Sequence, residues 1–217
     1  MLDEVLKYDL LIFDCDGTIR QSASGRVVPS SPDDVAIIPQ AQEFFNRLGT
    51  YRKRPRIALC SNQMGVGQRY AAEVWLATAE EKRGVAQWCH SMISSRPTEE
   101  EMEAIMQATA DAVGADEWVM CCYWPQVECG RTRPRPENPY PHQADTLFME
   151  YEGRWSEAWR KPATGMLQWL RASVQHTPAS PLPRTLMIGN GDEDNEAAAK
   201  VECDYMDAAA FWDMVSA

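Results

Sequence analysis

Residues 8–18 read Tyr-Asp-Leu-Leu-Ile-Phe-Asp-Cys-Asp-Gly-Thr, and this stretch decides the fold class. Its first part is a short apolar run that ends at Asp14, the pattern of a strand buried on both faces of a parallel sheet. Two carboxylates, Asp14 and Asp16, stand at the end of this run, and Gly17 permits a sharp turn. The stretch therefore predicts a parallel sheet with acidic side chains at the carboxyl end of one strand.

The rest of the chain alternates between strand and helix patterns. Apolar runs predict three more strands, at residues 56–60, 118–123 and 185–188. One-sided apolar patterns predict helices at residues 39–48, 68–92 and 98–114, and a further helix that opens at Lys161-Pro162. Strand, helix and strand in this order imply right-handed parallel units. We expect an α/β protein: a Rossmann-like three-layer sandwich with a parallel central sheet, forming a single domain over residues 1–217.

Residues 76–156 differ from the rest of the chain, because helical patterns give way to an irregular, proline-rich stretch. Residues 125–141 hold five prolines and three arginines with little periodicity. Long irregular loops are more often functional than idle. We expect this segment to be a small helical and irregular insert that caps the sheet.

Composition excludes several classes of protein. The 217 residues include 32 acidic and 21 basic side chains, so the net charge of −11 has the wrong sign for tight binding of duplex DNA. No apolar run approaches the length needed to cross a bilayer, so no membrane partner is expected. Seven scattered cysteines, an odd number, do not form a disulfide framework. We expect a cytoplasmic protein.

Four motifs follow one another at predicted strand or helix ends: Phe13-Asp14-Cys15-Asp16-Gly17-Thr18, Ser61-Asn62-Gln63, Arg160-Lys161-Pro162 and Gly189-Asn190-Gly191-Asp192-Glu193-Asp194. In this order they resemble the haloacid dehalogenase superfamily of phosphatases. The likeness is greatest to the group that contains the 3′-phosphatase domain of polynucleotide kinase-phosphatases, heptose-bisphosphate phosphatases and histidinol-phosphate phosphatases. Residues 24–29, 61–67 and 160–166 resemble the polynucleotide 3′-phosphatases in particular.

The resemblance implies a Mg²⁺-dependent phosphomonoesterase. Asp14 would be the nucleophile that forms an aspartyl-phosphate, and Asp16 would protonate the leaving oxygen and later accept a proton from water. The substrate phosphate would be held by Thr18, Ser61, Asn62, Arg160 and Lys161. Mg²⁺ would be bound by Asp14, the main-chain carbonyl of Asp16, Asn190 and Asp194.

The fourth motif departs from the family pattern. Relatives have Gly-Asp at its start, whereas this chain has Gly189-Asn190. An asparagine oxygen still binds Mg²⁺, but one formal negative charge is lost, so cation affinity should fall. Whether Asn190, Asp192 or Asp194 completes the metal site stays open, and a phosphate-binding relative without catalysis remains an alternative.

Cys122, Cys129 and His142 raise the question of zinc, because heptose-bisphosphate phosphatases carry a zinc loop in this part of the chain. The spacing here misses the structural zinc patterns, since no second Cys-x-Cys follows Cys122. Reduced cysteines of a core or loop are the favoured interpretation.

Substrate choice is expected to depend on residues 118–159, because the catalytic loops are generic. The tyrosines, tryptophans and arginines of this segment could stack on bases and bind backbone phosphates, or could pack as an ordinary cap. The motif likeness favours a 3′-phosphorylated nucleic-acid end, single-stranded, or a nucleotide. Net charge favours a small substrate, so a sugar-phosphate phosphatase is the alternative enzyme.

Overall fold

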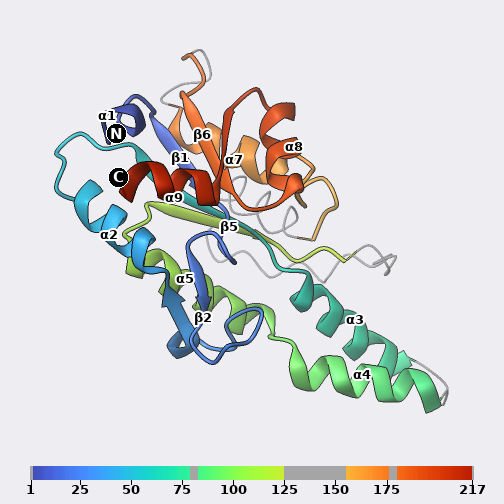
Figure 1. The fold of residues 1–217 in the computed structure, drawn as a ribbon. Helices are drawn as coiled ribbons and strands as arrows, with labels where there is room; N and C mark the ends of the chain where they lie inside the picture. Colours follow the sequence, from blue (N-terminus) through green and yellow to red (C-terminus); the bar gives the residue numbers. More distant parts are fainter. Residues whose placement is uncertain (1, 79–82, 125–154, 176–179, 217) are drawn as a thin grey trace, which may run out of the picture.

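The computed structural model describes residues 2–78, 83–124, 155–175 and 180–216. Within them, five strands form one sheet in the order β5-β4-β1-β6-β7, and every neighbouring pair is parallel (Figure 1). These strands are β1 (Leu10–Phe13), β4 (Arg56–Asn62), β5 (Glu117–Cys121), β6 (Thr185–Gly189) and β7 (Asp204–Asp207). The predicted α/β fold with a parallel central sheet is confirmed. The edge strand β7 was not predicted, because its sequence Asp-Tyr-Met-Asp is not an apolar run.

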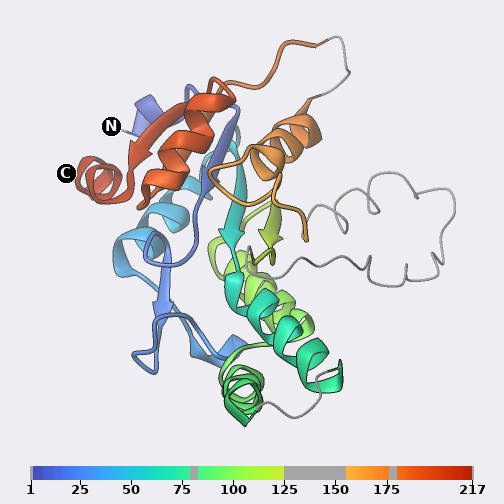
Figure 2. The same cartoon turned by 90° about the vertical axis from the view of Figure 1, so that its right-hand side faces the viewer.

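Helices cover both faces of the sheet (Figures 1 and 2). One face packs against α2 (Pro39–Leu48), α5 (Glu99–Val113) and α9 (Ala208–Ser216), and the other against α7 (Gly165–Val174) and α8 (Asp192–Lys200). The side chains of β1 alternate between the two cores, as the period of a strand requires: Leu11 and Phe13 enter the first, and Leu10 and Ile12 the second. No helix of the described residues combines the length and apolar character needed to cross a bilayer.

Aromatic rings of the first core fix the end of β1. Phe13 stacks on Trp212 of α9 at 6.1 Å between ring centroids and meets Phe45 of α2 edge-on at 5.1 Å. The Trp212 indole Nε1 also donates a hydrogen bond to the main-chain oxygen of Thr18, at 2.9 Å. The acidic loop after β1 is therefore anchored to the core by the C-terminal helix.

A small antiparallel hairpin follows the acidic loop. It consists of β2 (Arg20–Ser22) and β3 (Val35–Ile37), with the 3₁₀ turn η1 (Pro32–Asp34) before β3. The hairpin was not predicted, because each strand has only three residues and shows no usable alternation. A short N-terminal helix, α1 (Leu2–Val5), was not predicted either.

Two helices form an arm that extends away from the sheet: α3 (Met64–Thr78) and α4 (Arg83–Ser95). They lie side by side in both views and correspond to the predicted helical segment 68–92 (Figures 1 and 2). The arm begins directly after β4, so one of its ends stands at the carboxyl edge of the sheet.

The predicted helix start at Lys161-Pro162 is wrong. Turns occupy residues 155–164, and α7 begins at Gly165. The main-chain nitrogen of Lys161 donates to Asn62 Oδ1 at 3.0 Å, so the backbone at Lys161 is tied to the end of β4 rather than to a helix. A tertiary contact therefore overrides the local signal at Pro162.

Candidate active site

The carboxyl ends of three neighbouring strands bring the motifs together. Asp14 follows β1, Ser61 lies near the end of β4, and Asn190 follows β6. Lys161 arrives from the turns before α7 and reaches the same edge. This is the edge at which open parallel sheets hold their ligands.

Lys161 is the centre of the cluster. Its Nζ lies 2.7 Å from Asp14 Oδ1, 2.6 Å from Asp194 Oδ1 and 3.1 Å from the main-chain oxygen of Cys60. Burial alone would lower the pKa of Lys161, but Asp14, Cys60 and Asp194 together outweigh it and hold that pKa well above its ordinary value. Burial raises the pKa of Asp14, and the Lys161 ammonium only partly offsets this. Asp14 and Lys161 therefore form a tightly coupled buried pair.

Asp194 stands in the first turn of α8 and is 2% exposed. Besides contacting Lys161, its Oδ2 accepts a hydrogen bond from the main-chain nitrogen of Gly191 at 3.1 Å. A Cβ at Gly189 would lie only 2.3 Å from Asp194 Oδ2, so glycine is needed there for the carboxylate to reach the lysine. The structure thus places Asp194, expected as a metal ligand, against Lys161.

Thr18 and Asn62, both predicted to bind the substrate phosphate, form hydrogen bonds with other residues of the site. The hydroxyl of Thr18 is fully buried and donates to Asp14 Oδ2 at 3.3 Å. Asn62 makes two hydrogen bonds to the main chain of Lys161, through its Nδ2 at 3.1 Å and its Oδ1 at 3.0 Å. Thr18 therefore orients the nucleophile candidate, and Asn62 fixes the segment that carries the lysine.

Asp16 lies in a network of hydrogen bonds beside this cluster. Its two carboxylate oxygens accept from Arg20, and Oδ2 also accepts from Gln63 Nε2 at 2.8 Å. Gln63 Nε2 also donates to Ser61 Oγ at 2.6 Å, and Ser61 is 1% exposed. The Asp16 side chain keeps 22% exposure, so it remains reachable from the solvent side.

Arg160 is half-buried, and its buried Nη1 has no hydrogen-bond partner among the described residues. A buried guanidinium nitrogen without a partner is costly unless a ligand or water satisfies it. The expected role of Arg160 in binding the substrate phosphate stays a prediction.

The sequence did not single out Arg20 and Gln63. Gln63 belongs to the second motif, and its location one residue past Asn62 was the available signal. Arg20 stands four residues after Asp16 in a stretch without regular pattern, and no feature of the sequence shows that it is 0% exposed.

Oxygen atoms suited to a hard cation follow β1 and β6 at this edge, in Asp14, Asp16 and Asn190. Asn190 Nδ2 donates a hydrogen bond to the main-chain oxygen of Asp16 at 3.1 Å. Turning this amide group by about 180° places its oxygen, instead of its nitrogen, beside that carbonyl. Asp192 is exposed at the start of α8. Among residues 2–78, 83–124, 155–175 and 180–216, no group of three or more His, Cys, Asp or Glu side chains is arranged to hold a metal. Because Asp194 is paired with Lys161, the oxygen donors left for Mg²⁺ at this edge are the Asp14 carboxylate, the main-chain oxygen of Asp16 and the amide oxygen of Asn190, fewer carboxylates than predicted.

Of the three residues considered as zinc ligands, the structure describes only Cys122. Cys122 is buried in the first core, against Gly67 of α3, where an added methyl group would collide with the Cys122 main-chain oxygen. Cys129 and His142 lie outside the described residues, as do Tyr140, Tyr151 and the arginines of residues 131–154. Of the remaining aromatics, Trp155 packs on Tyr70 at 5.1 Å and Trp159 on Trp169 at 5.9 Å.

A groove of about 580 Å³ opens next to the site. It starts at Asn62 and Gln63 and is lined by three arginines, Arg26, Arg69 and Arg96. Buried polar atoms of the groove, Gln68 Oε1 and Arg96 Nε, have no hydrogen-bond partner among the described residues. Arg69 is paired with Glu73, so the groove presents the charges of Arg26 and Arg96 and unsatisfied polar atoms beside the candidate site.

A second hollow, of about 600 Å³, continues from the groove along the arm and shares Met64, Gln68 and Arg96 with it. Three tryptophans line it: Trp75, Trp88 and Trp124. Trp88 stacks on Trp124 at 5.6 Å between centroids and 18° between planes, and Trp75 lies 5.3 Å from Trp88. An aromatic surface therefore follows the arginines.

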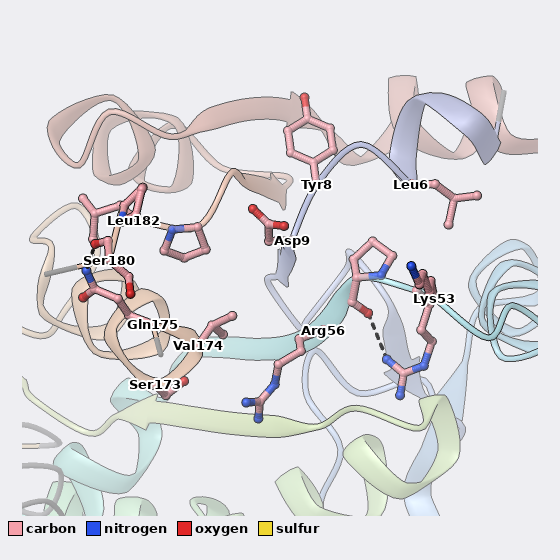
Figure 3. Close-up of a pocket in the computed structure, with 14 residues that line it drawn as sticks. Leu6, Tyr8, Asp9, Lys53, Arg56, Ser173, Val174, Gln175, Ser180 and Leu182 are labelled. Atoms are coloured by element: carbon pink, nitrogen blue, oxygen red, sulfur yellow. Dashed lines mark hydrogen bonds between the residues drawn. The ribbon is translucent and has the colours of Figure 1, made fainter. Parts of the chain in front are cut away.

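Another cavity, of about 710 Å³, lies at the other edge of the sheet, at the amino ends of β1, β4 and β6 (Figure 3). Figure 3 shows Lys53, Arg56 and Asp9 around it, and Asp9 Oδ2 accepts from the main-chain nitrogen of Arg184. It contains none of the motif residues, so the candidate site is at the carboxyl edge and not in this cavity.

Comparison with known proteins agrees with this geometry. The model of the family described as polynucleotide kinase 3 phosphatase matches residues 9–214. The fold is similar to a crystal structure of D,D-heptose 1,7-bisphosphate phosphatase from B. bronchiseptica complexed with magnesium and phosphate. That similarity has a TM-score of 0.54 and 18% identity, and it covers 96% of this chain and 98% of the other. No curated protein matches the sequence. With its family model matched over nearly the whole length, the chain is a phosphatase of the haloacid dehalogenase type and belongs to the polynucleotide kinase 3 phosphatase family.

Proposed function

We propose that the chain hydrolyses phosphomonoesters through an aspartyl-phosphate on Asp14, and that its substrate is a 3′-phosphorylated, single-stranded nucleic-acid end. The contact between Asp14 Oδ1 and Lys161 Nζ, 2.7 Å long at the carboxyl edge of the sheet, carries the first part of the proposal. A carboxylate nucleophile needs a neighbouring cation, because its own charge repels a phosphate dianion.

In the first half of the reaction, an oxygen of Asp14 attacks phosphorus and the bond to the ester oxygen breaks. The Asp16 carboxyl gives its proton to the departing oxygen, which leaves as an alcohol. Thr18 holds the other oxygen of Asp14, so the attacking atom keeps one orientation. This step exchanges one ester for an acyl phosphate.

In the second half, water attacks the phosphorus of the aspartyl-phosphate, and Asp16 accepts the proton of that water. The bond to Asp14 breaks, and inorganic phosphate leaves. Lys161, beside Asp14, and the hydroxyl of Ser61 would stabilise the phosphoryl oxygens in both transition states.

The oxygen donors at this edge support Mg²⁺ as the cofactor, held by the Asp14 carboxylate, the main-chain oxygen of Asp16 and the side-chain oxygen of Asn190. When bound, the ion neutralises charge between carboxylate and phosphate. The similar heptose-bisphosphate phosphatase was crystallised with magnesium and phosphate, which supports this assignment.

The groove supports the nucleic-acid part of the proposal. Arg69 is paired with Glu73 at 2.9 Å, but Arg26 and Arg96 line the groove with no ion pair among the described residues, in a chain whose net charge is −11. Such a local positive strip attracts the backbone of a strand whose 3′ phosphate is in the site.

The tryptophan surface supports the same substrate. Trp75 and Trp88 are partly exposed, and bases stack on aromatic rings without regard to sequence. Trp75 and Trp88 come from the arm outside the segment where the sequence analysis expected the recognition residues, and only Trp124 lies inside it. Phosphates would follow the arginines while the last bases meet the rings.

We also place the protein in the cytoplasm. Six cysteines of the described residues are free thiols, and five of these are buried, which suits a reducing compartment.

The catalytic part is tested by release of phosphate from p-nitrophenyl phosphate with Mg²⁺. We expect turnover by the wild type and its loss in Asp14→Asn. A chain that turns over no phosphomonoester with any divalent cation would support the alternative of a phosphate-binding protein without catalysis.

The substrate part is tested by comparing a 3′-phosphorylated oligonucleotide with heptose bisphosphate and histidinol phosphate. We expect the highest kcat/KM for the oligonucleotide. Arg96→Gln should raise its KM several-fold and reduce the salt slope by about one, while leaving p-nitrophenyl phosphate unaffected. Arg56→Gln, in the cavity at the opposite edge, is the matched control and should change neither. Preference for a sugar phosphate would refute this part.

A further inference from the structure

Arg20 is a charged side chain with no exposure to solvent. It stands at the start of β2 and is 0% exposed. Its Nε donates to Asp16 Oδ1 at 2.8 Å, and its Nη2 donates to Asp16 Oδ2 at 3.2 Å. Two parallel hydrogen bonds of this kind fix the plane of the carboxylate as well as its position.

The guanidinium is itself held from the other side. Its Nη1 donates to Thr109 Oγ1 at 2.7 Å, and Thr109, in α5, is fully buried. The Thr109 hydroxyl in turn donates to the main-chain oxygen of Ile105 at 2.8 Å, so it has one orientation. Arg20 therefore connects α5 to Asp16 without freedom to rotate.

Gln63 is a second residue that holds the Asp16 carboxylate by a hydrogen bond. Its Nε2 reaches Asp16 Oδ2 at 2.8 Å from the end of β4. The carboxylate is thus held from β2 and from β4, while its 22% exposure leaves it accessible to the site.

Stability does not account for a fully buried arginine at this position. A buried ion pair costs several kcal/mol of desolvation per ion, and apolar residues of similar volume are often equally stable or better. The Arg20 pair includes Asp16, the residue proposed to exchange the proton, so a role in that step accounts for the buried arginine.

We infer that Arg20 is a positioning residue: anchored by Thr109, it fixes the Asp16 carboxyl group for proton exchange with the leaving oxygen. This inference rests on the proposed function of Asp16. The Arg20 side chain is 0% exposed and hydrogen-bonds to Asp16, Met106 and Thr109, so it would act only through Asp16.

A comparison of substrates with different leaving groups tests whether Arg20 positions Asp16. When the phosphorus–oxygen bond breaks, the electron pair stays on the departing oxygen. An alkyl alcohol, such as the 3′ hydroxyl of a nucleoside, needs the proton of Asp16 at that moment, whereas p-nitrophenol leaves readily as its anion. Misplacing Asp16 therefore slows alkyl substrates more than aryl ones.

The experiment compares a nucleoside 3′-phosphate with p-nitrophenyl phosphate in Arg20→Met, Arg20→Lys and Thr109→Val. We expect the ratio of kcat for the alkyl substrate to kcat for the aryl one to fall about tenfold or more in Arg20→Met. Arg20→Lys, which keeps the charge but loses the paired geometry, should recover part of the ratio, and Thr109→Val should lower it slightly. KM should stay within about twofold for both substrates.

Asp16→Asn is the reference background. Because Arg20 acts through Asp16, adding Arg20→Met to Asp16→Asn should not lower the ratio further. Equal losses on both substrates, or a further fall in the double variant, would overturn the inference and leave a structural role. If Arg20→Met does not fold, an unchanged ratio in both Arg20→Lys and Thr109→Val overturns it. A wild type that turns over neither substrate would overturn the proposed function itself, and with it this role of Arg20.

Discussion

Lys161 Nζ lies 2.7 Å from Asp14 Oδ1, although 147 positions of sequence separate the two residues. The same ammonium lies 2.6 Å from Asp194, so one buried cation stands between two buried carboxylates. The three groups together carry one net negative charge, which a bound cation would neutralise. We therefore expect the replacement of Lys161 and the replacement of Asp14 to change the stability of the protein in different ways.

Lys161→Met should unfold more easily than the wild type. It leaves Asp14 and Asp194 buried without a counter-charge, and removing one partner of a buried ion pair costs about 3–5 kcal/mol. Thermal and denaturant unfolding at pH 7 measure this. A change in the free energy of unfolding below about 1 kcal/mol would contradict the expected burial of the pair.

Asp14→Asn should abolish turnover without destabilising the fold. Because burial raises the pKa of Asp14, its ionised form at pH 7 costs stability, and a neutral side chain removes that cost. Lys161 keeps Asp194 as a partner. We expect a Tm equal to or above that of the wild type, and a fall of more than about 4 °C would refute this.

Asn190→Asp should strengthen Mg²⁺ binding. The substitution returns one formal negative charge beside the main-chain oxygen of Asp16, and cation affinity rises with the number of charged ligands. We expect the dissociation constant for Mg²⁺, measured by calorimetry, to fall on the order of tenfold. Asn195→Asp, on the exposed side of α8, is a control that adds the same charge away from the site. Equal effects of both substitutions would show a general charge effect only.

Gly189→Ala should damage the site through Asp194. The new methyl would lie 2.3 Å from Asp194 Oδ2, so the carboxylate must leave Lys161 or the strand must shift. Overpacking of this kind costs about 1–3 kcal/mol. Gly65→Ala is the comparison, because its methyl would meet the flexible side chain of Arg96 at 3.4 Å and Pro97 at an ordinary contact distance of 3.8 Å. It should be neutral or stabilising by up to about 1 kcal/mol, since alanine favours the helix.

Asp34→Asn should loosen the turn of the hairpin. The main-chain nitrogen of Ser30 donates to the Asp34 carboxylate, as does that of Ser24, and these bonds hold the pKa of Asp34 well below its usual range. A lowered pKa means that the stabilisation is complete above the unfolded value of about 3.9 and is lost progressively as the pH falls from there through the lower pKa of the folded protein. Amide exchange of Ser24 and Ser30 should therefore lose protection below about pH 4.

The same amides should lose protection at pH 7 in Asp34→Asn. Asp33→Asn serves as the control, because Asp33 is exposed. Unchanged protection in Asp34→Asn would show that the serine contacts do not organise the turn.

The sequence alone determined the sheet and the location of the site. The apolar runs of β1, β4, β5 and β6 are long enough to predict strands, and each motif stands at the end of such a run or near the start of a helix. Since the carboxyl ends of parallel strands share one edge, the motifs could be placed together before any contact was known. The hairpin, β7 and α9 escaped prediction, because their patterns are short or depend on neighbours.

Only the tertiary structure decided which side chains touch. Asp194 pairs with Lys161, Arg20 fixes Asp16 against Thr109, and the tryptophans of the arm continue the arginine groove. Local periodicity records which face of an element is buried, but it holds no information on which distant polar group meets another. Buried charges must find partners wherever the chain brings them, and that choice is made by packing.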